Sequence, residues 1–259
     1  MILGAQFYTL RNHTQTPEGI RETFRRVKEI GYDAVQISAI GKDIPASLLR
    51  ELSLEYGLPI TCTHTAFDRI VNDTDRVIEE HKLFGCTEVG LGAMNGEFRG
   101  NLANLERFIA LMTPAVEKIR KAGLTFGYHN HAFEFDPLED GEGVIFDHLV
   151  ARTDWNFILD TYWVAYAGGD PVDFIRRLEG RILNLHFKDM KTSPKGPICP
   201  VGQGVLDFAA IVRAAEETGI RFGLVEQDNA PDLATAEWDE FAQMADSYRH
   251  LRPLIPSVR

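Results

Sequence analysis

The amino-acid sequence predicts an α/β protein built as a (β/α)8 (TIM) barrel, with residues 1–259 forming a single domain. Three observations favour this class. Short apolar, β-branched runs alternate with helix-like stretches eight times, glycines end most of those stretches, and no Pro/Gly/Ser-rich linker divides the chain. Strands that alternate with helices indicate a parallel sheet, and eight such units in about 250 residues match a closed barrel.

The eight strand-like runs are short and rich in aliphatic and β-branched residues. They lie near residues 3–8, 34–38, 59–65, 88–92, 124–131, 156–161, 182–188 and 221–227. An open doubly wound sheet is the structural alternative. Such a sheet usually carries a glycine-rich dinucleotide-binding turn after its first strand, whereas here the first run continues into Phe7-Tyr8-Thr9-Leu10-Arg11. The barrel is therefore favoured.

The stretches between the runs have the periodicity of amphipathic helices. In residues 20–30 the apolar side chains of Ile20, Phe24, Val27 and Ile30 form one stripe, and Gly31 follows as a helix stop. The same stop recurs before later strand-like runs, at Gly57, Gly85, Gly123 and Gly219. Each helix is therefore expected to end just before the next strand begins.

Composition narrows the class of protein. The formal net charge of −11 disfavours a nucleic-acid partner, since a phosphate backbone is bound by clustered Lys and Arg. Three widely spaced cysteines do not make a disulfide framework and fit a reducing compartment. No apolar run is long enough to span a membrane, and the N-terminal residues do not resemble a signal peptide. We therefore expect a cytoplasmic protein with no membrane or nucleic-acid partner.

Four acidic or imidazole side chains follow or end consecutive strand-like runs, namely Glu134, Asp160, His186 and Glu226. In a barrel the carboxyl ends of neighbouring strands meet at one face, which is where active sites lie. Three carboxylates and one imidazole converging there would repel one another unless a cation lay between them. The alternative for a single acid is that it caps the next helix, and Asp160 is the member most open to that interpretation.

This ligand set predicts a divalent metal site. Oxygen ligands with one imidazole suit ions of the manganese, cobalt or magnesium type, whereas thiolate-rich sites suit zinc. Manganese is the favoured ion, with Co²⁺, Mg²⁺ and Zn²⁺ as alternatives. The pattern therefore indicates a metal-dependent enzyme.

Further polar side chains near the strand ends are candidates for binding a polyhydroxylated substrate. Strand alternation puts His129 and His131 on one face, without deciding which of the two faces the site. Lys188 shares the face of His186, where it either stabilises an anionic oxygen or pairs with one of the acids. The remaining candidates are His64 at the third strand end, Tyr8 at the first, and Gln203 in a Gly/Pro-rich loop after the seventh strand.

Several motifs resemble one known family. They are Gly4–Arg11, Ala34–Ser38, the run Tyr128-His129-Asn130-His131-Ala132-Phe133-Glu134-Phe135, Leu159–Trp163, His186-Phe187-Lys188-Asp189 and Gly202-Gln203-Gly204. Together they are similar to the sugar phosphate isomerase/epimerase-like group of the xylose isomerase-like TIM barrel superfamily. The resemblance covers nearly the whole chain, and it is more specific for the fold and the metal site than for the substrate.

The resemblance implies a divalent ion held by Glu134, Asp160, His186 and Glu226 and a small carbohydrate as substrate. It also implies that Glu134 and Glu226 act as the acid/base pair of a sugar isomerase or epimerase, by α-proton abstraction through a metal-stabilised cis-enediolate. The alternative is a metal-dependent lyase or dehydratase acting on a 3-keto-glycoside or an inosose. Whether the chain forms a homo-oligomer is left open.

This chain departs from the ketose 3-epimerase branch at three positions that help to hold the substrate. Trp163 stands where that branch has His, Thr192 where it has Arg, and Gln36 where it commonly has Glu. A free ketohexose is therefore disfavoured as the substrate. Trp163 either stacks on a sugar ring or packs beneath the barrel rim.

Two other functions remain as alternatives at this stage. A DNA-repair endonuclease on this fold would need more His and acidic ligands and a basic groove, and the net charge of −11 is against it. A non-catalytic sugar-binding barrel would keep the metal without the chemistry, and the presence of both Glu134 and Glu226 argues against it.

Overall fold

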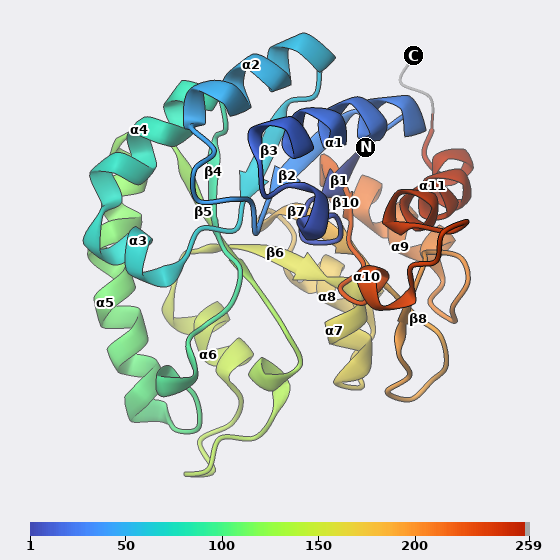
Figure 1. The fold of residues 1–259 in the computed structure, drawn as a ribbon. Coiled ribbons are helices and arrows are strands. Elements are labelled where there is room, and N and C mark those ends of the chain that lie inside the picture. The colour runs from blue at the N-terminus through green and yellow to red at the C-terminus, as the bar shows by residue number, and fades with distance from the viewer. Residues whose placement is uncertain (257–259) are drawn as a thin grey trace.

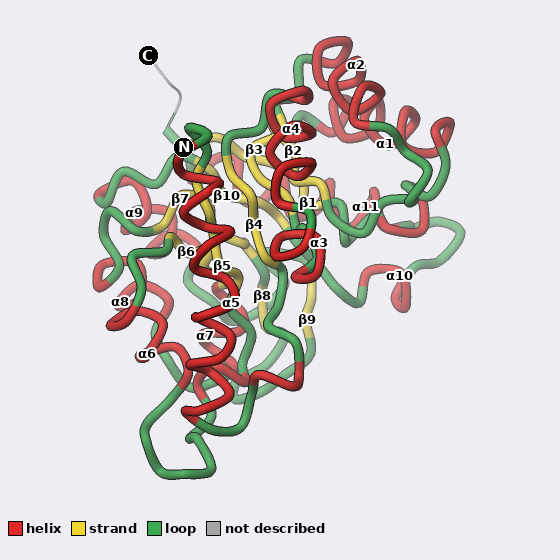
Figure 2. Tube along the Cα trace, turned by 90° about the vertical axis from the view of Figure 1, so that its left-hand side faces the viewer, coloured by secondary structure: helices red, strands yellow, loops and turns green. Residues whose placement is uncertain are grey.

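Eight parallel strands form one sheet that curls into a nearly closed barrel, with helices around its outer face (Figure 1). The computed structural model describes residues 1–256. Neighbouring strands pair in the order β3-β2-β1-β10-β7-β6-β5-β4. The predicted fold class is therefore confirmed. Figure 2 shows the strands at the centre of the molecule with helices on either side of them.

The strands match the predicted runs closely. Their bounds are β1 Ile2–Gln6, β2 Ala34–Ile37, β3 Ile60–Thr63, β4 Glu88–Leu91, β5 Thr125–His129, β6 Asn156–Asp160, β7 Ile182–Phe187 and β10 Phe222–Val225. A two-stranded antiparallel hairpin, which the sequence did not predict, follows β7 directly. It consists of β8 Asp189–Met190 and β9 Ile198–Cys199.

The helices fill the predicted intervals and include several short ones. Their bounds are α1 Pro17–Ile30, α2 Ala46–Tyr56, α3 Phe67–Asn72, α4 Thr74–Phe84, α5 Leu102–Lys121, α6 Ile145–Arg152, α7 Thr161–Tyr166, α8 Pro171–Arg177, α9 Phe208–Glu217, α10 Ala230–Leu233 and α11 Glu240–Leu251. The described residues also form four 3-10 turns: η1 Arg11–His13, η2 Gly96–Phe98, η3 Phe133–Phe135 and η4 Arg252–Leu254. In residues 1–256 we find no helix with both the length and the apolar content that crossing a bilayer requires.

The glycine stops behave as predicted, because all five residues adopt positive φ angles that disfavour other residues (Gly31, Gly57, Gly85, Gly123 and Gly219). In α1 the predicted stripe faces the sheet, with Ile20, Phe24 and Val27 fully buried. Local sequence thus fixes both the end of each helix and the face that it buries.

The seam between the first and last strands of the sheet is narrow. No ladder joins β3 to β4 within the described residues, but the Thr65 amide donates to the Gly90 carbonyl across the seam at 2.7 Å. A side chain at position 90 would collide with the carbonyl oxygen of Thr63, since a Cβ there would lie 2.1 Å from it. Glycine at this position therefore allows the two strands to approach.

Residues inside the barrel alternate along the strands and form layers. One apolar layer consists of Cys62, Ile158 and Leu224, which lies apart from the large core between sheet and helices. Each of the three precedes a polar strand-end residue by two positions, namely His64, Asp160 and Glu226. Because side chains two apart point to the same face of a strand, this layer supports the polar residues at the barrel mouth.

A buried acid lies deeper in the barrel. Glu88 on β4 accepts a hydrogen bond from the side-chain amide of Asn184 on β7, and both residues are almost fully buried. Glu88 Oε1 and Asn184 Oδ1 have no hydrogen-bond partner among the described residues. Burial raises the pKa of Glu88 to about 8, with the Asn184 bond opposing the shift. The carboxyl group is therefore protonated in the folded protein at neutral pH.

We expect the Glu88→Gln variant to become more stable than the wild type as the pH rises. An unfolded Glu loses its proton near pH 4.5, whereas folded Glu88 keeps it up to about pH 8. Wild-type stability should therefore fall across this window, and a neutral glutamine removes that loss. Thermal unfolding between pH 5 and pH 8.5 measures the difference, which should grow with pH to several degrees. Parallel pH curves for the two proteins would show that Glu88 does not titrate in this way.

Candidate metal centre and active site

Four side chains from four neighbouring strands converge at the carboxyl end of the barrel. His129 ends β5, Asp160 ends β6, His186 lies next to the end of β7, and Glu226 follows β10. Strand register sets two of these neighbours side by side, because Asp160 pairs with His186 across β6 and β7. Each residue contributes one nitrogen or oxygen atom to a group whose members all lie within 4.8 Å of one another. All four side chains are buried.

At one position the structure differs from the predicted ligand set, because Glu134 does not join this group and His129 does. Glu134 lies in η3, where its carboxylate accepts hydrogen bonds from the Tyr128 hydroxyl at 2.7 Å and from the His131 amide at 2.8 Å. β5 ends at His129, and Tyr128 points to the opposite face, where its ring contacts Phe108 of α5. Glu134 is thus directed toward the helix layer rather than the barrel mouth.

Burial also changes the ionisation of Glu134. The side chain is fully enclosed, and burial raises its pKa to about 7 in spite of the hydrogen bonds from Tyr128 and His131. The Tyr128 hydroxyl and the His131 amide each bond one carboxylate oxygen, and together they fix the side chain in place. In this position Glu134 supports the turn after β5.

The two histidines of the cluster are each oriented by a hydrogen bond from the ring nitrogen that does not face a carboxylate. His129 Nδ1 lies 2.9 Å from the Gly92 carbonyl, which only accepts, so Nδ1 carries the hydrogen. Its other nitrogen, Nε2, lies 3.3 Å from Asp160 Oδ2. His186 is arranged similarly, with Nε2 at 2.6 Å from Gln36 Oε1 and Nδ1 at 2.8 Å from Glu226 Oε2. Ring nitrogens therefore face carboxylate oxygens, an arrangement that requires a proton or a cation between them.

Lys188 brings a positive charge to the same place. Its ammonium nitrogen lies 2.9 Å from Asp160 Oδ2, 2.8 Å from Glu226 Oε2 and 3.0 Å from Asp228 Oδ1. Of the two roles predicted for Lys188, the structure shows the ion pairs. The carboxyl groups of Asp160, Glu226 and Asp228 outnumber the one ammonium, so the cluster has acidic groups left over that a divalent cation would compensate. Buried charge without compensation is costly, so the cluster is suited to such an ion.

The pKa values of this cluster follow from its mixed charges. Burial raises the pKa of Glu226, but the Lys188 ammonium and the His186 ring outweigh burial and hold the pKa well below its usual range. Asp160 behaves in the same way, with Lys188 and His129 outweighing burial to lower its pKa. For Lys188, burial lowers the pKa, but Asp160, Asp228 and Glu226 together raise it well above its usual value. The two acids are therefore ionised and the lysine is charged at neutral pH.

Asp160 caps the next helix, one of the two roles considered from the sequence, and it also faces the cluster. Its Oδ1 accepts a hydrogen bond from the Trp163 amide at 3.0 Å and so caps α7. Its Oδ2 faces His129 and Lys188. The Asp160 amide in turn donates to Asn130 Oδ1 at 3.0 Å. Helix capping thus orients the carboxylate toward the cluster.

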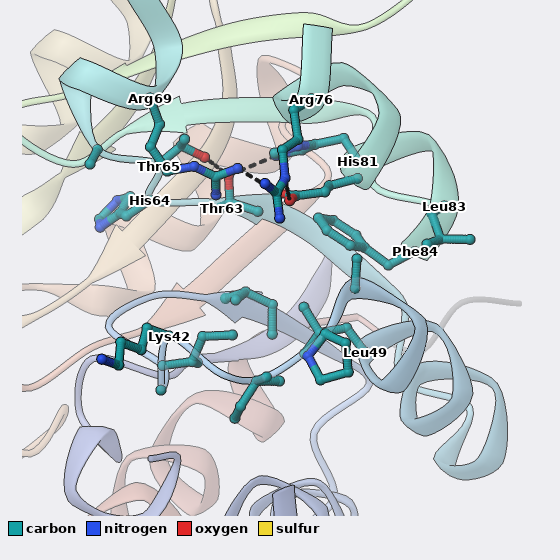
Figure 3. Close-up of a pocket in the computed structure, with 18 of the residues that line it drawn as sticks. Lys42, Leu49, Thr63, His64, Thr65, Arg69, Arg76, His81, Leu83 and Phe84 are labelled. Atoms are coloured by element: carbon teal, nitrogen blue, oxygen red, sulfur yellow. Dashed lines mark hydrogen bonds and ion pairs between the residues drawn. The ribbon is translucent and has the colours of Figure 1, made fainter. Parts of the chain in front are cut away.

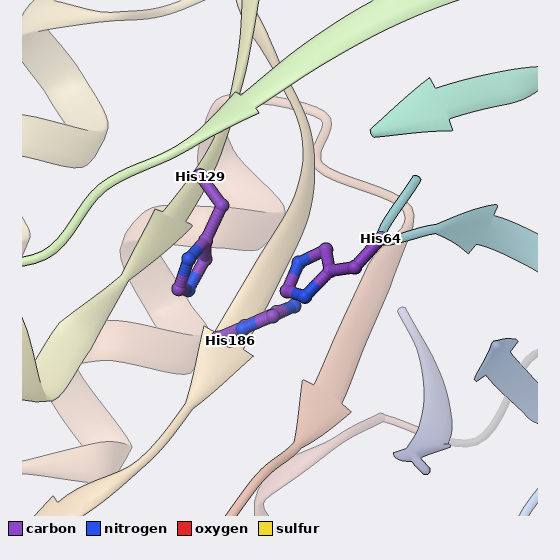
Figure 4. A group of neighbouring side chains, drawn as sticks. All are labelled: His64, His129 and His186. Atoms are coloured by element: carbon purple, nitrogen blue, oxygen red, sulfur yellow. The ribbon is translucent and has the colours of Figure 1, made fainter. Parts of the chain in front are cut away.

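Three of the predicted substrate-binding residues surround this centre. The His64 ring lies 4.9 Å from that of His129 and 5.3 Å from that of His186, and Figure 4 shows the three rings facing one another. His131 lies beyond β5, with its ring 5.4 Å from Trp163 and 4.8 Å from His129. The open question about β5 is thereby resolved, because His129 enters the cluster and His131 borders it.

Several polar atoms at this mouth are buried and have no hydrogen-bond partner. Within the described residues these are His64 Nε2, His131 Nδ1, Trp163 Nε1 and Gln36 Nε2. Burial, followed by the neighbouring histidines, lowers the pKa of His64 well below its usual value, and burial lowers that of His131 to about 3. The two rings are therefore neutral near pH 7. A ligand with several hydroxyl groups would satisfy such atoms.

Two predicted residues are not brought to the centre. Tyr8 is 36% exposed and its ring stacks beneath the Arg11 guanidinium. Gln203 is exposed and bonds Asp246 of α11 at 3.3 Å. The loop that carries Gln203 is fixed by Asp189, whose carboxylate accepts hydrogen bonds from the amides of Gly202 and Gly204, both at 3.0 Å.

Three residues of the site, Gln6, Asn130 and Asp228, were not predicted as part of it, and a fourth, Gln36, was noted only as a departure from the epimerase branch. Gln36 orients His186, Gln6 donates to Glu226 Oε1 at 2.6 Å, Asn130 contacts the Asp160 amide, and Asp228 pairs with Lys188. Gln6 and Gln36 lie at or next to the ends of β1 and β2, and Asp228 lies two residues beyond Glu226. Gln6, Gln36 and Asp228 could have been found by considering every polar residue near a strand end, and those two positions further along, which point to the same face.

Comparisons with known proteins agree with the barrel fold described above. A family model described as "Xylose isomerase-like TIM barrel" matches residues 24–254. An inosose dehydratase of Geobacillus kaustophilus is 24% identical over 270 residues, which cover 88% of this chain and 85% of that protein. An inosose dehydratase of Lacticaseibacillus casei is 26% identical over 163 residues, covering 54% of this chain and 52% of that protein.

Solved structures with the same architecture carry isomerase and epimerase names. A sugar phosphate isomerase/epimerase from Parabacteroides distasonis superposes with a TM-score of 0.79 at 22% identity, covering 98% of this chain and 95% of that one. An L-ribulose 3-epimerase superposes with a TM-score of 0.72 at 16% identity and the same coverage. At these identities the likeness establishes the fold.

Proposed function

Since the chain belongs to the xylose isomerase-like TIM barrel family, we propose that it is a divalent-metal-dependent enzyme that removes a proton α to the carbonyl of a sugar or cyclic polyol. The observation that carries the proposal is the convergence of His129, Asp160, His186 and Glu226 at the barrel mouth. Relatives in the family bear the names of enzymes that act on such substrates, both dehydratases and epimerases.

The residues at this centre fit a divalent ion. Two carboxylates and two imidazoles are oxygen and nitrogen donors without thiolate, which suits manganese or cobalt, with zinc and magnesium as further candidates. His129 is oriented by the Gly92 carbonyl and His186 by Gln36, so that one nitrogen of each ring faces the carboxylates. When bound, the ion would supply positive charge that stabilises a developing oxyanion and so increases the acidity of the adjacent C–H.

The protein's own groups have distinct roles in this proposal. Glu226 is ionised and belongs to the cluster, so it accepts the α-proton. The charged Lys188 ammonium stabilises negative charge on the substrate oxygen. The neutral rings of His64 and His131 and the Trp163 indole N–H bind substrate hydroxyl groups.

Elimination of a β-leaving group, either water or an aglycone, is favoured over epimerisation as the outcome of proton removal. Epimerisation by two opposed glutamates requires a second glutamate at the mouth, whereas Glu134 lies outside the cluster and is bonded to Tyr128 and His131. In the elimination the α-proton passes to Glu226, the β C–O bond breaks, and the leaving oxygen takes that proton from Glu226 and departs as water or as the aglycone alcohol, which regenerates the carboxylate. The names of the curated relatives support this reaction, and the sugar isomerase or epimerase remains the second candidate.

Solvent-deuterium exchange followed by NMR and mass spectrometry tests the proposal. The wild-type protein with added Mn²⁺ would be incubated with an inosose, a 3-keto-glucoside and a set of ketoses. We expect exchange at the carbon next to the carbonyl, together with a product lighter than the substrate by one water or by the aglycone. Products of unchanged mass would support the epimerase alternative, and absence of exchange from every substrate would refute the proposed function.

A matched pair of variants separates the two glutamates. We expect Glu226→Gln to abolish exchange while keeping much of the bound metal, because the amide retains an oxygen but cannot accept the proton. Glu134→Gln should keep exchange within about tenfold of wild type, since Glu134 acts through the turn after β5. Loss of exchange in Glu134→Gln, with normal folding by circular dichroism, would restore the two-glutamate mechanism.

A further inference from the structure

A large cleft opens beside the metal centre, between the segment that joins β2 to α2 and the segment formed by α3 and α4 (Figure 3). Its volume is about 970 Å³. Building on the proposed function, we propose that this cleft binds a second, uncharged sugar ring, so that the enzyme acts on glycosides rather than on single sugars. We call it the ring cleft, defined by Ser38, Lys42, Ser47, His64, Arg69 and Leu83 along its walls.

The ring cleft begins at the metal centre. His64 lines the cleft, and one of its ring nitrogens also lies within 4.8 Å of a ring nitrogen of His129 and one of His186. Ser38 Oγ lies 3.4 Å from His64 Nδ1 at the same end. His64 Nε2 is buried and has no partner among the described residues. A substrate bound at the centre would therefore reach the cleft past His64.

The cleft is larger than one sugar ring needs. Sites of about 300–1,000 Å³ accommodate drug-sized ligands, and the ring cleft reaches the upper end of that range. Ile44, Leu49 and Phe84 give part of its wall an apolar surface. Sugar rings offer apolar C–H faces as well as hydroxyl groups, so a wall of mixed polarity suits them. The space is therefore sufficient for a second ring beyond the one at the metal centre.

Charges in the cleft are compensated, which disfavours a phosphate group. Arg69 and Arg76 both pair with Glu80, at 2.8 and 3.0 Å. Acidic side chains outnumber basic ones along the lining, by four to three. His81 is neutral because burial lowers its pKa to about 4, and its Nε2 lies 2.9 Å from the Thr63 hydroxyl. The lining thus offers hydrogen-bonding groups without a net positive charge, which fits a neutral hydroxylated ring.

Two substitutions would block the cleft without touching the metal centre. Ser47 lies in the first turn of α2 and is exposed, and Leu83 near the end of α4 is 45% exposed. A tryptophan at either position would fill cleft volume without disturbing the core. Leu54→Trp is the matched control, because Leu54 is on the same helix as Ser47, is 68% exposed and does not line the cleft.

Calorimetric titration of the full-length protein with three probes tests the proposal: methyl α-glucoside as one ring, trehalose as two neutral rings, and glucose 6-phosphate as an anion. We expect wild type and Leu54→Trp to bind trehalose at least about tenfold more tightly than methyl glucoside. Ser47→Trp and Leu83→Trp should lose that preference and keep the affinity for methyl glucoside.

The proposal is overturned if trehalose binds no better than methyl glucoside to wild type, if both blocking variants keep the preference, or if glucose 6-phosphate binds most tightly. Wild type that binds none of the three probes would overturn it as well. Deuterium exchange by the same protein preparations, measured with the inosose, 3-keto-glucoside and ketose substrates named above, separates this result from the proposed function. Exchange without a two-ring preference refutes the ring cleft alone, whereas a two-ring preference without exchange refutes the chemistry alone.

Discussion

Asp160→Asn is expected to lower the affinity for Mn²⁺ by at least about 100-fold and to abolish turnover. The substitution removes the negative charge whose Oδ2 faces His129 and Lys188. It keeps an Oδ1 acceptor for the Trp163 amide, since asparagine caps helices as well as aspartate does. Folding should therefore be preserved while metal binding is lost. Calorimetric titration with Mn²⁺ and thermal unfolding of the same samples measure the two effects.

Asp170→Asn provides the control for this substitution. Asp170 caps α8 through a hydrogen bond from the Val172 amide at 2.8 Å and takes no part in the candidate metal centre. Its replacement should leave the affinity for Mn²⁺ unchanged. An Asp160→Asn protein with wild-type affinity would show that Asp160 serves only as a helix cap.

Lys188→Met is expected to destabilise the metal-free protein by about 3–5 kcal/mol, because it leaves buried carboxylates without their cationic partner. The lysine is 1% exposed, so solvent cannot replace the lost charge. Added Mn²⁺ should restore much of the stability, since a divalent ion would compensate the same acids. Thermal unfolding in EDTA and in Mn²⁺ compares the two states, and the gain on adding metal should be larger for the variant than for wild type.

Lys191→Met controls for the loss of a lysine in the same region. Lys191 is exposed, and its ammonium donates to the Gln203 carbonyl at 3.0 Å. Its replacement should change stability by no more than about 0.5 kcal/mol in either condition. A Lys188→Met protein as stable as wild type in EDTA would mean that the buried acids are protonated rather than paired with the ammonium.

The barrel could be predicted from the sequence because its signals are local. Eight strand–helix units are indicated by β-branched runs, by helical spacing of apolar residues and by glycines at helix ends. In the structure these glycines have positive φ angles. The hairpin of β8 and β9 has no such signal. It is short, lies in a Gly/Pro-rich segment, and depends on Asp189, whose carboxylate binds several loop amides that no periodicity indicates.

The candidate site could be predicted only for residues at strand ends, where side chains alternate between the two faces of the sheet. Asp160, His186 and Glu226 lie on the inner face at strand ends, and the structure brings them together. Glu134 lies five residues beyond the end of β5, where the turn through η3 decides its direction. The alternation of side chains along β5 places His129 on the face of the mouth. That Glu134 does not join it there follows from its hydrogen bond with Tyr128, which only the structure shows. Side-chain direction beyond a strand end is set by packing rather than by spacing.

Electron paramagnetic resonance of the metal-free protein titrated with Mn²⁺ tests the central claim most directly, because it counts bound ions and detects coupling to ligand nitrogens. The account predicts one tightly bound ion per chain with two imidazole nitrogens, from His129 and His186, and a single nitrogen in a His129→Ala variant. Absence of a bound ion, or a single nitrogen ligand in the wild-type protein, would contradict it.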